Sequence, residues 1–489
     1  MSSMEISKAY TFDDILLIPQ KSNVKPSDCQ TATYLSKKIK LEVPIISAAM
    51  DTVSESKLAI AMAQLGGASC IHKNMSIEQQ VDEVLKVKKY ESGMVVDPIT
   101  IGPDNNISDV KRIITEKSIS GIPVVNKNNQ ILGIITNRDL RFNLNDKIKV
   151  KDLMTKNVIT IKQGYNSLSA KKLLHKHRIE KLIVTNNKNQ CLGLITVKDI
   201  EKSEKFPLAS KDEKKSLVVG AAIGVDQDGV NRAVSLMKAG CDFLTIDTAH
   251  GHSQSVINTV KKIRSLNKNI TLIAGNIATA EAAIELAKLK VDAVKVGIGP
   301  GSICTTRVVA GIGFPQFSAI VNVKKALSKF KDVKIIADGG IRYSGDIAKA
   351  LGAGADAVMI GSLLAGTDET PGEIFYYQGR SYKSYRGMGS IAAMARGSAD
   401  RYFQQDIKDQ LKLVPEGIEG RVPYRGPVKN IIDQLIGGLK SSMGYLGAKN
   451  LKDFQKNAKF IEISNSGIKE GHVHDVQITK QSPNYPVND

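Results

Sequence analysis

The chain has 489 residues, of which 42% are apolar and 24% charged, and its formal net charge is +19. This length excludes a single ordinary domain, and the composition excludes a disordered chain. No apolar run reaches the roughly 18 residues that a membrane-spanning helix needs, and the N-terminus has no apolar stretch of signal-peptide type, so we expect a cytoplasmic protein without a membrane anchor.

The strong positive charge raises the hypothesis of a nucleic-acid-binding protein. Lys and Arg are spread over the whole chain, however, and an aromatic content of 5% with no Trp leaves few platforms on which bases can stack. A lysine-rich solvated surface, or phosphorylated small-molecule ligands, is the favoured interpretation. The five cysteines show no CxxC pair and no metal-ligand spacing, which indicates a reducing compartment.

Short runs rich in β-branched residues, each followed by alanine-rich amphipathic text, recur along the chain and predict strand–helix units. The predicted strands are 43–47, 67–72, 216–222, 242–248, 270–276, 292–297, 333–340 and 356–362. Eight such units predict an α/β fold of the (β/α)8 TIM-barrel type. A doubly wound sheet is the alternative, because the strand text alone does not distinguish the two.

An internal repeat interrupts this series after the second strand. The text "NKNNQILGIITNRDL", Asn126–Leu140, reappears as "NNKNQCLGLITVKDI", Asn186–Ile200, sixty positions later. A unit this small buries little apolar surface alone, so the two copies are expected to share a core. The region 93–202 resembles a tandem pair of CBS modules, 93–152 and 153–202, inserted between barrel parts 1–92 and 203–489. The resemblance implies a regulatory role and binding of adenine or guanine nucleotides.

A cysteine stands in an unusual place after the sixth predicted strand. The stretch "GPGSICTTR", Gly299–Arg307, offers Cys304 on a glycine-lined loop beside hydroxyls, where a thiolate can be stabilised and reached. Such a thiolate is a strong nucleophile. The carbonyls of Gly299 and Gly301 suit a hard, weakly polarising cation rather than zinc. The alternative is an inert small residue in a turn.

The last two predicted strands end in glycine-rich text, "ADGGIRYSGD" and "MIGSLLAG". In a barrel the loops at these two ends often grip a phosphate, because backbone N–H groups can approach an anion there. Gly339–Gly340 and Gly361–Ser362 fit that role, although glycines also make simple tight turns. Asp338, at the end of the seventh strand, can accept hydrogen bonds from the two hydroxyls of a ribose.

Beyond the predicted strands, "YRGMGSIA" matches G-x-G-x-x-A, but no βαβ unit surrounds it, so we interpret it as a loop that lies flat against a base or sugar. The text that follows is rich in Gly, charge and aromatic residues and has little periodicity. This composition is typical of a mobile lid, which we place at about 385–425. Arg401 and Tyr402 are neighbours within it, and Glu416 follows.

Several of these stretches together closely resemble the inosine-5′-monophosphate (IMP) dehydrogenase family of bacterial type. They are "YTFDDILLIP", "ISAAMDTVSE", "GPGSICTTRVVAGIG", "IADGGIRYSGDIAKALGAGADAVMIG", "YRGMGSIAAM" and "EGHVHDVQIT". The likeness runs over essentially the whole chain. It implies NAD-dependent oxidation of IMP to XMP, the committed step of guanine nucleotide biosynthesis.

The resemblance also implies roles for individual residues. The Cys304 thiolate would attack C2 of the purine and hydride would pass to NAD+, after which water would hydrolyse the covalent thioimidate. Arg401 would act as the base in hydrolysis with Tyr402 assisting, Thr306 would orient the water, and Glu416 would contact the hypoxanthine or relay a proton. Loss of a proton from a guanidinium, whose pKa exceeds 12, requires help from burial and from the adjacent tyrosine.

The same resemblance supplies the binding residues. IMP would be bound by Ser302, Asp338, Gly339, Gly340, Gly361, Ser362, Tyr385, Gly387, Met388, Gly389 and Glu416. NAD would contact Asp247, Gly297, Ile298 and Gly299. Potassium would lie on carbonyls of Gly299, Gly301 and Cys304, completed by Glu470, Gly471 and His472 from a neighbouring subunit. A shared site of this kind implies a homotetramer, and the CBS pairs would allow octamers.

Two rival hypotheses are open. GMP reductase shares the barrel and a cysteine in a similar loop, but it generally lacks the Arg–Tyr lid and commonly the CBS insertion. A nucleotide-sensing or nucleic-acid-binding regulator with an inactive barrel is the second rival, and steep salt-dependent RNA binding without turnover would favour it.

Overall fold

The structure, a computed structural model, describes residues 6–90, 95–96, 98–117, 119–141, 145–404, 406–407, 409–480 and 482–485. It forms two compact units. The first comprises the described residues up to Lys89, together with Leu208–Ser210 and the chain from Leu217 onward, and the second comprises Tyr90–Pro207 and Lys211–Ser216. The predicted boundary at 92 and 93 lies outside the described residues.

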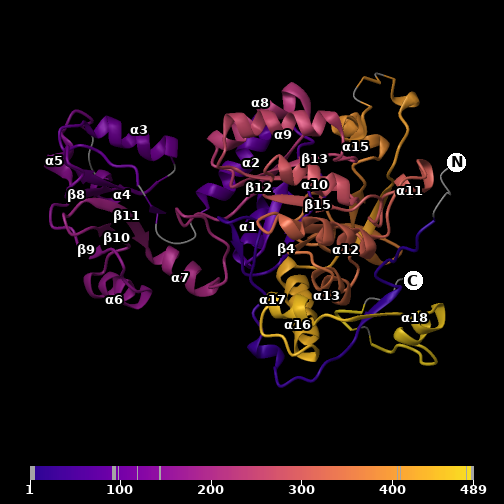
Figure 1. Cartoon of the computed structure of the whole chain (residues 1–489). Helices are drawn as coiled ribbons and strands as arrows, with labels where there is room; N and C mark the ends of the chain where they lie inside the picture. Colours follow the sequence, from indigo (N-terminus) through magenta and orange to yellow (C-terminus); the bar gives the residue numbers. More distant parts are fainter. Residues whose placement is uncertain are drawn as a thin grey trace. The chain divides into compact units, whose positions relative to one another are not determined.

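The first unit contains a closed barrel of eight parallel strands (Figure 1). In chain order the strands are β4 (Ile45–Ser47), β5 (Ala68–Ile71), β12 (Gly220–Ile223), β13 (Phe243–Asp247), β14 (Thr271–Ile277), β15 (Ala293–Val296), β16 (Lys334–Asp338) and β17 (Ala357–Ile360). Each strand pairs with the next in the chain, and β17 closes the ring by pairing with β4. The prediction of a (β/α)8 barrel is confirmed, and the doubly wound alternative is excluded.

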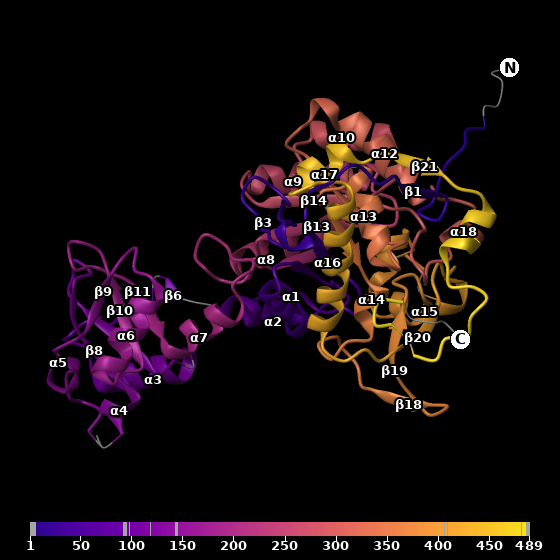
Figure 2. The ribbon, with the colours of Figure 1, turned by 90° about the horizontal axis from the view of Figure 1, so that it is seen from below.

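Helices follow the strands and cover the outside of the barrel (Figures 1 and 2). They are α1 (Ser56–Gln64), α2 (Ile77–Lys89), α8 (Asp226–Lys238), α9 (Gln254–Leu266), α10 (Ala280–Lys288), α12 (Gln316–Ala326), α13 (Ser344–Gly352) and α16 (Val428–Tyr445). Their sequences explain the packing. In α10 the alanines and Leu286 face inward, and the side chain of Thr279 caps the first turn.

The end of the barrel at which the strands begin is closed by a short hairpin, β2 (Thr33–Tyr34) and β3 (Lys40–Leu41). Its residues Leu35 and Leu41 are fully buried in the same apolar cluster as the barrel interior. Ser36 hydrogen-bonds Thr271 at the start of β14, at 2.8 Å. Because this end is filled, access to the barrel is from the carboxyl ends of the strands.

The barrel interior depends on one close contact between strands. Phe243, fully buried in β13, lies against Gly220 in β12, where an added Cβ would lie 2.0 Å from a ring carbon. We expect Gly220→Ala to lower the unfolding temperature, at a cost of about 1–3 kcal/mol, because the ring has no free space into which to move. Calorimetry measures the change. Gly345→Ala is the control, since nothing lies within 4 Å of the added atom, and an equal effect in both variants would contradict the packing argument.

The second unit reproduces the sequence repeat in its elements. α3 (Ile107–Lys117), β7 (Gly121–Val125) and β8 (Ile131–Thr136) recur sixty positions later as α6 (Ser167–His177), β10 (Lys181–Thr185) and β11 (Cys191–Thr196). The other elements are β6 (Val95–Val96), α4 (Asn137–Leu140), α5 (Val150–Leu153), β9 (Thr160–Lys162) and α7 (Val197–Lys205).

The two copies are joined in a nearly twofold manner. Ile131 N donates to Asn189 O at 3.1 Å, and the equivalent Cys191 N donates to Asn129 O at 2.9 Å. A small apolar cluster between the copies includes Cys191 from one and Ile131 from the other. A core shared by the two copies is therefore present.

The remaining elements extend the barrel. The strands are β1 (Ile15–Leu17), β18 (Phe375–Tyr377), β19 (Arg380–Arg386), β20 (Glu419–Pro423) and β21 (Phe460–Glu462), and the helices are α11 (Thr306–Val309), α14 (Ser362–Ala365), α15 (Ile391–Ala395), α17 (Leu451–Asn457) and α18 (Asn465–Gly471). Four turns of 3₁₀ helix are η1 (Pro26–Asp28), η2 (Leu327–Lys329), η3 (Ser398–Tyr402) and η4 (Gln410–Lys412). β1 pairs with β21, so segments near the two ends of the chain lie together.

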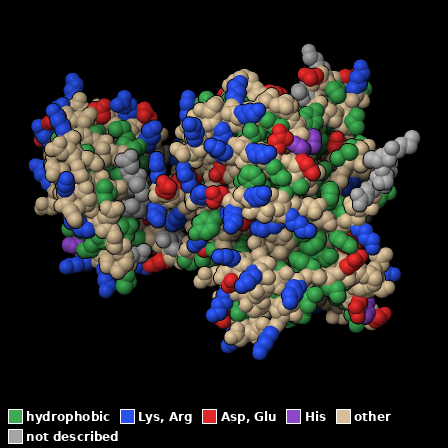
Figure 3. Space-filling view, in the orientation of Figure 1, with side chains coloured by type: hydrophobic (Ala, Val, Ile, Leu, Met, Phe, Trp, Pro, Cys, Tyr) green, Lys and Arg blue, Asp and Glu red, His purple; other side chains and the backbone are tan. Residues whose placement is uncertain are grey.

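The surface carries its charge in a dispersed form. Figure 3 shows Lys and Arg side chains scattered among other residues over the visible face. Among the residues that the structure describes, no helix has the length and apolar content required to cross a bilayer.

Candidate active site

The cysteine loop follows β15 at the open end of the barrel. Gly297 and Gly299 have φ values of 150° and 71°, which side-chain-bearing residues rarely adopt. Arg307, from the short helix α11, packs against Gly299, where an added Cβ would lie 2.7 Å from its side chain. The Arg307 guanidinium donates to Phe314 O at 2.5 Å and to Ile298 O at 3.3 Å, and so braces the loop from behind.

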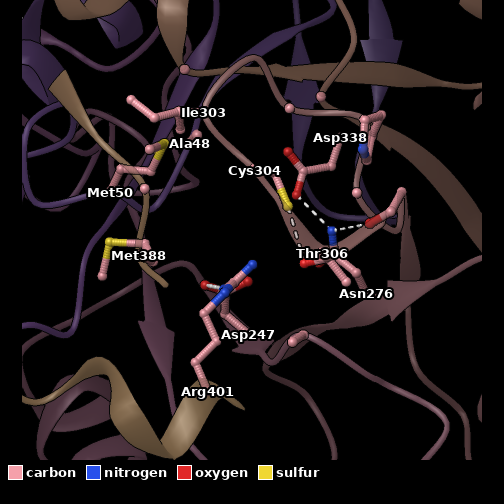
Figure 4. A pocket seen from close by; sticks show the side chains of 18 of the residues that line it. Ala48, Met50, Asp247, Asn276, Ile303, Cys304, Thr306, Asp338, Met388 and Arg401 are labelled. Atoms are coloured by element: carbon pink, nitrogen blue, oxygen red, sulfur yellow. Dashed lines mark hydrogen bonds and ion pairs between the residues drawn. The ribbon is translucent and has the colours of Figure 1, made fainter. Parts of the chain in front are cut away.

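Cys304 is partly exposed, whereas the other four cysteines are buried. Its Sγ lies 3.1 Å from Oγ1 of Thr306, as Figure 4 shows. In contrast, burial raises the pKa of the Cys70 thiol to about 12 and also raises that of Cys241. Cys304 is thus the cysteine suited to act as a nucleophile.

The cysteine loop is joined by backbone hydrogen bonds to the segment 416–418. Thr305 N donates to Glu416 O at 2.9 Å, and Ile418 N donates to Ile303 O at 3.1 Å. On its other side this segment bonds to a third one, since Glu416 N donates to Gly389 O at 3.0 Å. An added Cβ at Gly389 would lie 2.7 Å from the Tyr402 ring. The glycine therefore allows the tyrosine to lie flat against the backbone.

A cavity at the carboxyl ends of the strands, which we call the cysteine pocket, collects most of the residues predicted from the sequence (Figure 4). Those that line it are Asp247, Gly297, Ile298, Gly299, Gly301, Cys304, Thr306, Asp338, Gly339, Gly361, Tyr385, Gly387, Met388, Arg401, Tyr402 and Glu416. Gly389 lies just behind, against Tyr402. These residues come from four barrel strands or the loops that follow them, β13, β15, β16 and β17, and from the predicted lid, so the fold brings them together.

An adjoining cavity, the glycine pocket, holds the remaining residues predicted for a phosphate. Ser302, Gly340 and Ser362 line it, and it shares Gly339, Gly361 and Tyr385 with the cysteine pocket. Arg307 and Arg342 also line it and bring positive charge. Two pockets that share one wall, one with a nucleophile and one with glycines and cations, fit the base and the phosphate of a nucleotide.

A third cavity, the histidine pocket, extends from the other side of the cysteine pocket. It shares Ala249, Ile298, Thr306, Tyr402 and Glu416 with that pocket, and its other lining residues are largely apolar: His250, His252, Ile277, Ala278, Thr279, Ala282, Ala310, Ile312, Gly313, Phe314 and Phe403. Sequence reasoning missed His250, His252 and Phe314. The text "DTAHGHS" directly after a predicted strand end was the available signal for the histidines.

Buried charges form a continuous chain along the cysteine pocket. Arg401 pairs with Asp247, Asp247 Oδ1 lies 2.9 Å from Lys295 Nζ, and Lys295 Nζ lies 2.6 Å from Asp338 Oδ2. Asn276 Nδ2 also donates to Asp338 Oδ2, at 2.9 Å. The signs alternate, so the four charges are neutral in sum. Sequence reasoning missed Lys295 and Asn276.

These alternating charges shift the pKa values of Asp247 and Arg401. Burial alone would raise the pKa of Asp247, but Arg401 and Lys295 hold it well below its usual range. Burial alone would lower the pKa of Arg401, but Asp247 raises it above its usual value. Burial raises the pKa of Tyr402 to about 12. Burial thus favours loss of the Arg401 proton as expected, but Asp247 outweighs it and Tyr402 also raises the pKa, so Arg401 is a cation paired with Asp247 in this arrangement.

The predicted lid, 385–425, begins and ends in regular structure. Tyr385 in β19 pairs with Gly420 in β20 in an antiparallel sheet with β18, which also excludes a βαβ unit around "YRGMGSIA". Between these strands, Asp400 pairs with the buried Lys73, and Ala249 N donates to Arg401 O at 3.0 Å. Positions 405 and 408 lie outside the described residues. The lid segment is thus held over the open end of the barrel.

Within one chain, the three residues predicted to complete a potassium site do not lie at the cysteine pocket. Glu470 and Gly471 end α18, and the His472 ring lies 6.3 Å from that of Tyr343, while its Nδ1 lies 2.8 Å from the Tyr485 hydroxyl. None of the three lines the cysteine pocket. Over the described ranges, no group of three or more His, Cys, Asp or Glu side chains could hold a metal ion. A site on carbonyls would need these residues from another subunit.

The fold and the site together define a (β/α)8-barrel enzyme with a cysteine at the carboxyl ends of its strands. A family model described as IMP dehydrogenase / GMP reductase domain matches residues 9–474. The chain belongs to this family.

Individual relatives are similar over nearly the whole length. Proteins named inosine-5′-monophosphate dehydrogenase are 55% identical in Rhizobium tropici (96% of this chain, 95% of the relative) and 54% identical in Helicobacter pylori (98% and 99%). A crystal structure of a cysteine-to-alanine variant of GMP reductase from Trypanosoma brucei, in complex with guanosine 5′-monophosphate, superposes with a TM-score of 0.79 at 39% identity, covering 97% of this chain and 99% of that one. That reductase aligns with almost all of this chain, so the presence of an inserted unit does not distinguish an IMP dehydrogenase from a GMP reductase.

Proposed function

We propose that this chain oxidises IMP to XMP with NAD+ as hydride acceptor, in guanine nucleotide biosynthesis. The observation that carries the proposal is the meeting of Cys304, Thr306, Arg401 and Tyr402 in one pocket, in a chain whose relatives at more than 50% identity are named inosine-5′-monophosphate dehydrogenase.

The first step is oxidation. The phosphate of IMP binds in the glycine pocket near Ser302, Gly340 and Ser362, and its ribose hydroxyls donate to Asp338. The Cys304 thiolate forms a bond to C2 of the purine, and hydride leaves C2, which gives a thioimidate. NAD+, when bound, supplies the hydride acceptor. The histidine pocket fits the dinucleotide because it is apolar and opens onto the cysteine pocket beside Ile298 and Thr306.

The second step is hydrolysis. Water oriented by Thr306 adds to C2 of the thioimidate, its proton passes to Arg401 assisted by Tyr402 or through Glu416, and the carbon–sulfur bond breaks to give XMP and the free thiolate. Arg401 can accept this proton only after it has left Asp247, whose pairing raises its pKa, and has given up its own proton to water. The lid therefore has one arrangement in which Arg401 is a held cation and another in which it is a base.

We also propose that the protein binds potassium and forms a homotetramer. Potassium would be held by carbonyls of Gly299, Gly301 and Cys304, whose turn supplies hard oxygen ligands, and would order the cysteine loop. Glu470, Gly471 and His472 would come from a neighbouring subunit, hence a homotetramer, with octamers through the inserted units. The five cysteines form no disulfide bond with one another, which supports a cytoplasmic location.

GMP reductase is the second candidate, favoured by the superposition with the reductase from Trypanosoma brucei. One assay separates the two. Incubation with IMP and NAD+ should give XMP and NADH in equal amounts. Chromatography measures the XMP, and absorbance measures the NADH. Consumption of GMP and NADPH, without any reaction of IMP, would overturn the proposal in favour of the reductase.

The inserted unit is proposed to be a regulatory CBS pair that binds adenine or guanine nucleotides. The barrel closes entirely from strands of the first unit, so deletion of Gly93–Lys202 is expected to leave kcat close to that of the full chain and to remove any effect of added ATP or GTP on the rate. Steady-state assays with and without nucleotide measure both. A soluble but inactive deletion variant would show that the unit is needed for catalysis.

A further inference from the structure

Lys295 is the most deeply buried charged residue of the cysteine pocket. Only 1% of it is exposed, and it stands in β15, where its neighbours along the strand are fully buried apolar residues. Burying an ammonium group is costly, and an apolar side chain at such a position is often as stable or more so. A lysine here therefore requires a reason other than packing.

The contacts of Lys295 point to that reason. Its ammonium lies between two carboxylates, 2.9 Å from Asp247 Oδ1 and 2.6 Å from Asp338 Oδ2, and it also donates to Asn276 Oδ1. Without a cation between them, two neighbouring carboxylates would repel, and one would take up a proton. Burial alone would lower the pKa of Lys295, but the two carboxylates raise it, so the cation is retained.

The two side chains that donate to the Asp338 carboxyl group both bond to the same oxygen. Lys295 and Asn276 both donate to Oδ2, and no donor among the described residues bonds to Oδ1. Figure 4 shows Asp338 and Asn276 side by side on one wall of the pocket that contains Cys304. Asp338 is thus fixed through one oxygen and free to accept hydrogen bonds through the other.

We propose that Lys295 is a positioning residue, which fixes the Asp338 carboxyl group through Oδ2 so that Oδ1 accepts hydrogen bonds from the ribose hydroxyls of the substrate. This inference rests on the proposed function, since it takes IMP as the ligand. Lys295 touches neither the base nor the sulfur, and acts through Asp338.

The test compares two ligands and two buried lysines. Isothermal titration measures Kd for IMP and for 2′,3′-dideoxy-IMP, which lacks both hydroxyls, with the full chain and with Lys295→Met. Lys383→Met is the matched control, because Lys383 is 2% exposed and donates only to Thr367 O and Thr370 O, outside all three pockets.

The unsubstituted chain should bind IMP about tenfold or more tightly than the dideoxy compound, because hydroxyls bonded to a carboxylate are lost in the analogue. Lys295→Met should weaken IMP binding by about tenfold and leave dideoxy-IMP nearly unchanged. Lys383→Met should preserve the discrimination, even if its unfolding temperature falls. If Lys295→Met does not fold, Lys295→Gln, which keeps a neutral donor, should show a reduced discrimination.

Equal weakening of both ligands, or an unchanged ratio in the Lys295 variants, would overturn the role proposed for Lys295. Failure of the unsubstituted chain to bind IMP would instead overturn the proposed function. The two failures are therefore distinguishable in one set of titrations.

Discussion

Replacement of Cys304 by alanine is expected to abolish the formation of both NADH and XMP, with a loss of at least about 10⁴-fold in kcat. The reason is that hydride can leave C2 of IMP only after that carbon has become tetrahedral, and the sulfur supplies the bond that makes it so. Stopped-flow absorbance of NADH and mass spectrometry of the protein after mixing with IMP and NAD+ measure the two consequences. The unsubstituted chain should carry the added mass of the purine nucleotide on the peptide that contains Cys304.

Cys241→Ala is the control for this experiment. Cys241 is buried, and its Sγ lies 3.2 Å from Phe243 O and 3.5 Å from Val219 O, away from the cysteine pocket. This variant should keep its turnover and its covalent adduct. Residual hydride transfer above background in Cys304→Ala would refute nucleophilic attack by this residue.

Arg401→Gln is expected to slow hydrolysis far more than hydride transfer. A general base contributes about 10²–10⁴-fold, and that loss should fall on the second step, because Arg401 lies beside Tyr402 and takes no part in forming the carbon–sulfur bond. Rapid mixing with IMP and NAD+ should show a burst of one NADH per site, followed by a slow steady rate. The adduct should accumulate and be trapped by acid quenching.

Arg421→Gln serves as the comparison for that variant. Arg421 stacks on the Tyr377 ring at 3.6 Å in the sheet beyond the pocket, so its loss should leave both steps unchanged. If Arg401→Gln slows hydride transfer as much as hydrolysis, Arg401 acts through Asp247 on the nucleotide site and not as a base.

The barrel could be predicted because its signals are local. Each strand is an apolar β-branched run followed by a helix. All eight predicted runs overlap an observed barrel strand, and six of them contain it whole. The bounds were less accurate where an apolar run continues outside the sheet. The third run was predicted at 216–222, whereas β12 is Gly220–Ile223, because Val218 N bonds to Ser210 O and Val219 N bonds to the side chain of Asp242.

The electrostatics of the site could not be predicted in the same way. A lysine in a predicted strand is normally interpreted as solvent-exposed. Only the convergence of β13, β15 and β16 in the folded barrel brings Asp247 and Asp338 to Lys295. Tyr402 is adjacent to Arg401 in the sequence, so an influence on the pKa of Arg401 was predicted, but Tyr402 raises that pKa instead of lowering it. Asp247 is distant in the sequence and close in space, and it reverses the expected direction for the pKa of Arg401.

The backbone bonds around Gly389 and Glu416 restrict which part of the chain can swing. The bond from Glu416 to Gly389 joins the two ends of the lid to each other, and Glu416 is bonded in turn to the cysteine loop, so we expect the hinges to lie between Ser390 and Pro415. Within this span the side chains of Asp400 and Arg401 are paired with Lys73 and Asp247, and Ala249 N donates to Arg401 O. We expect Arg401 to leave by exchanging these partners for water while the cysteine loop keeps its own bonds, so that one stationary nucleophile would serve both of the proposed reactions.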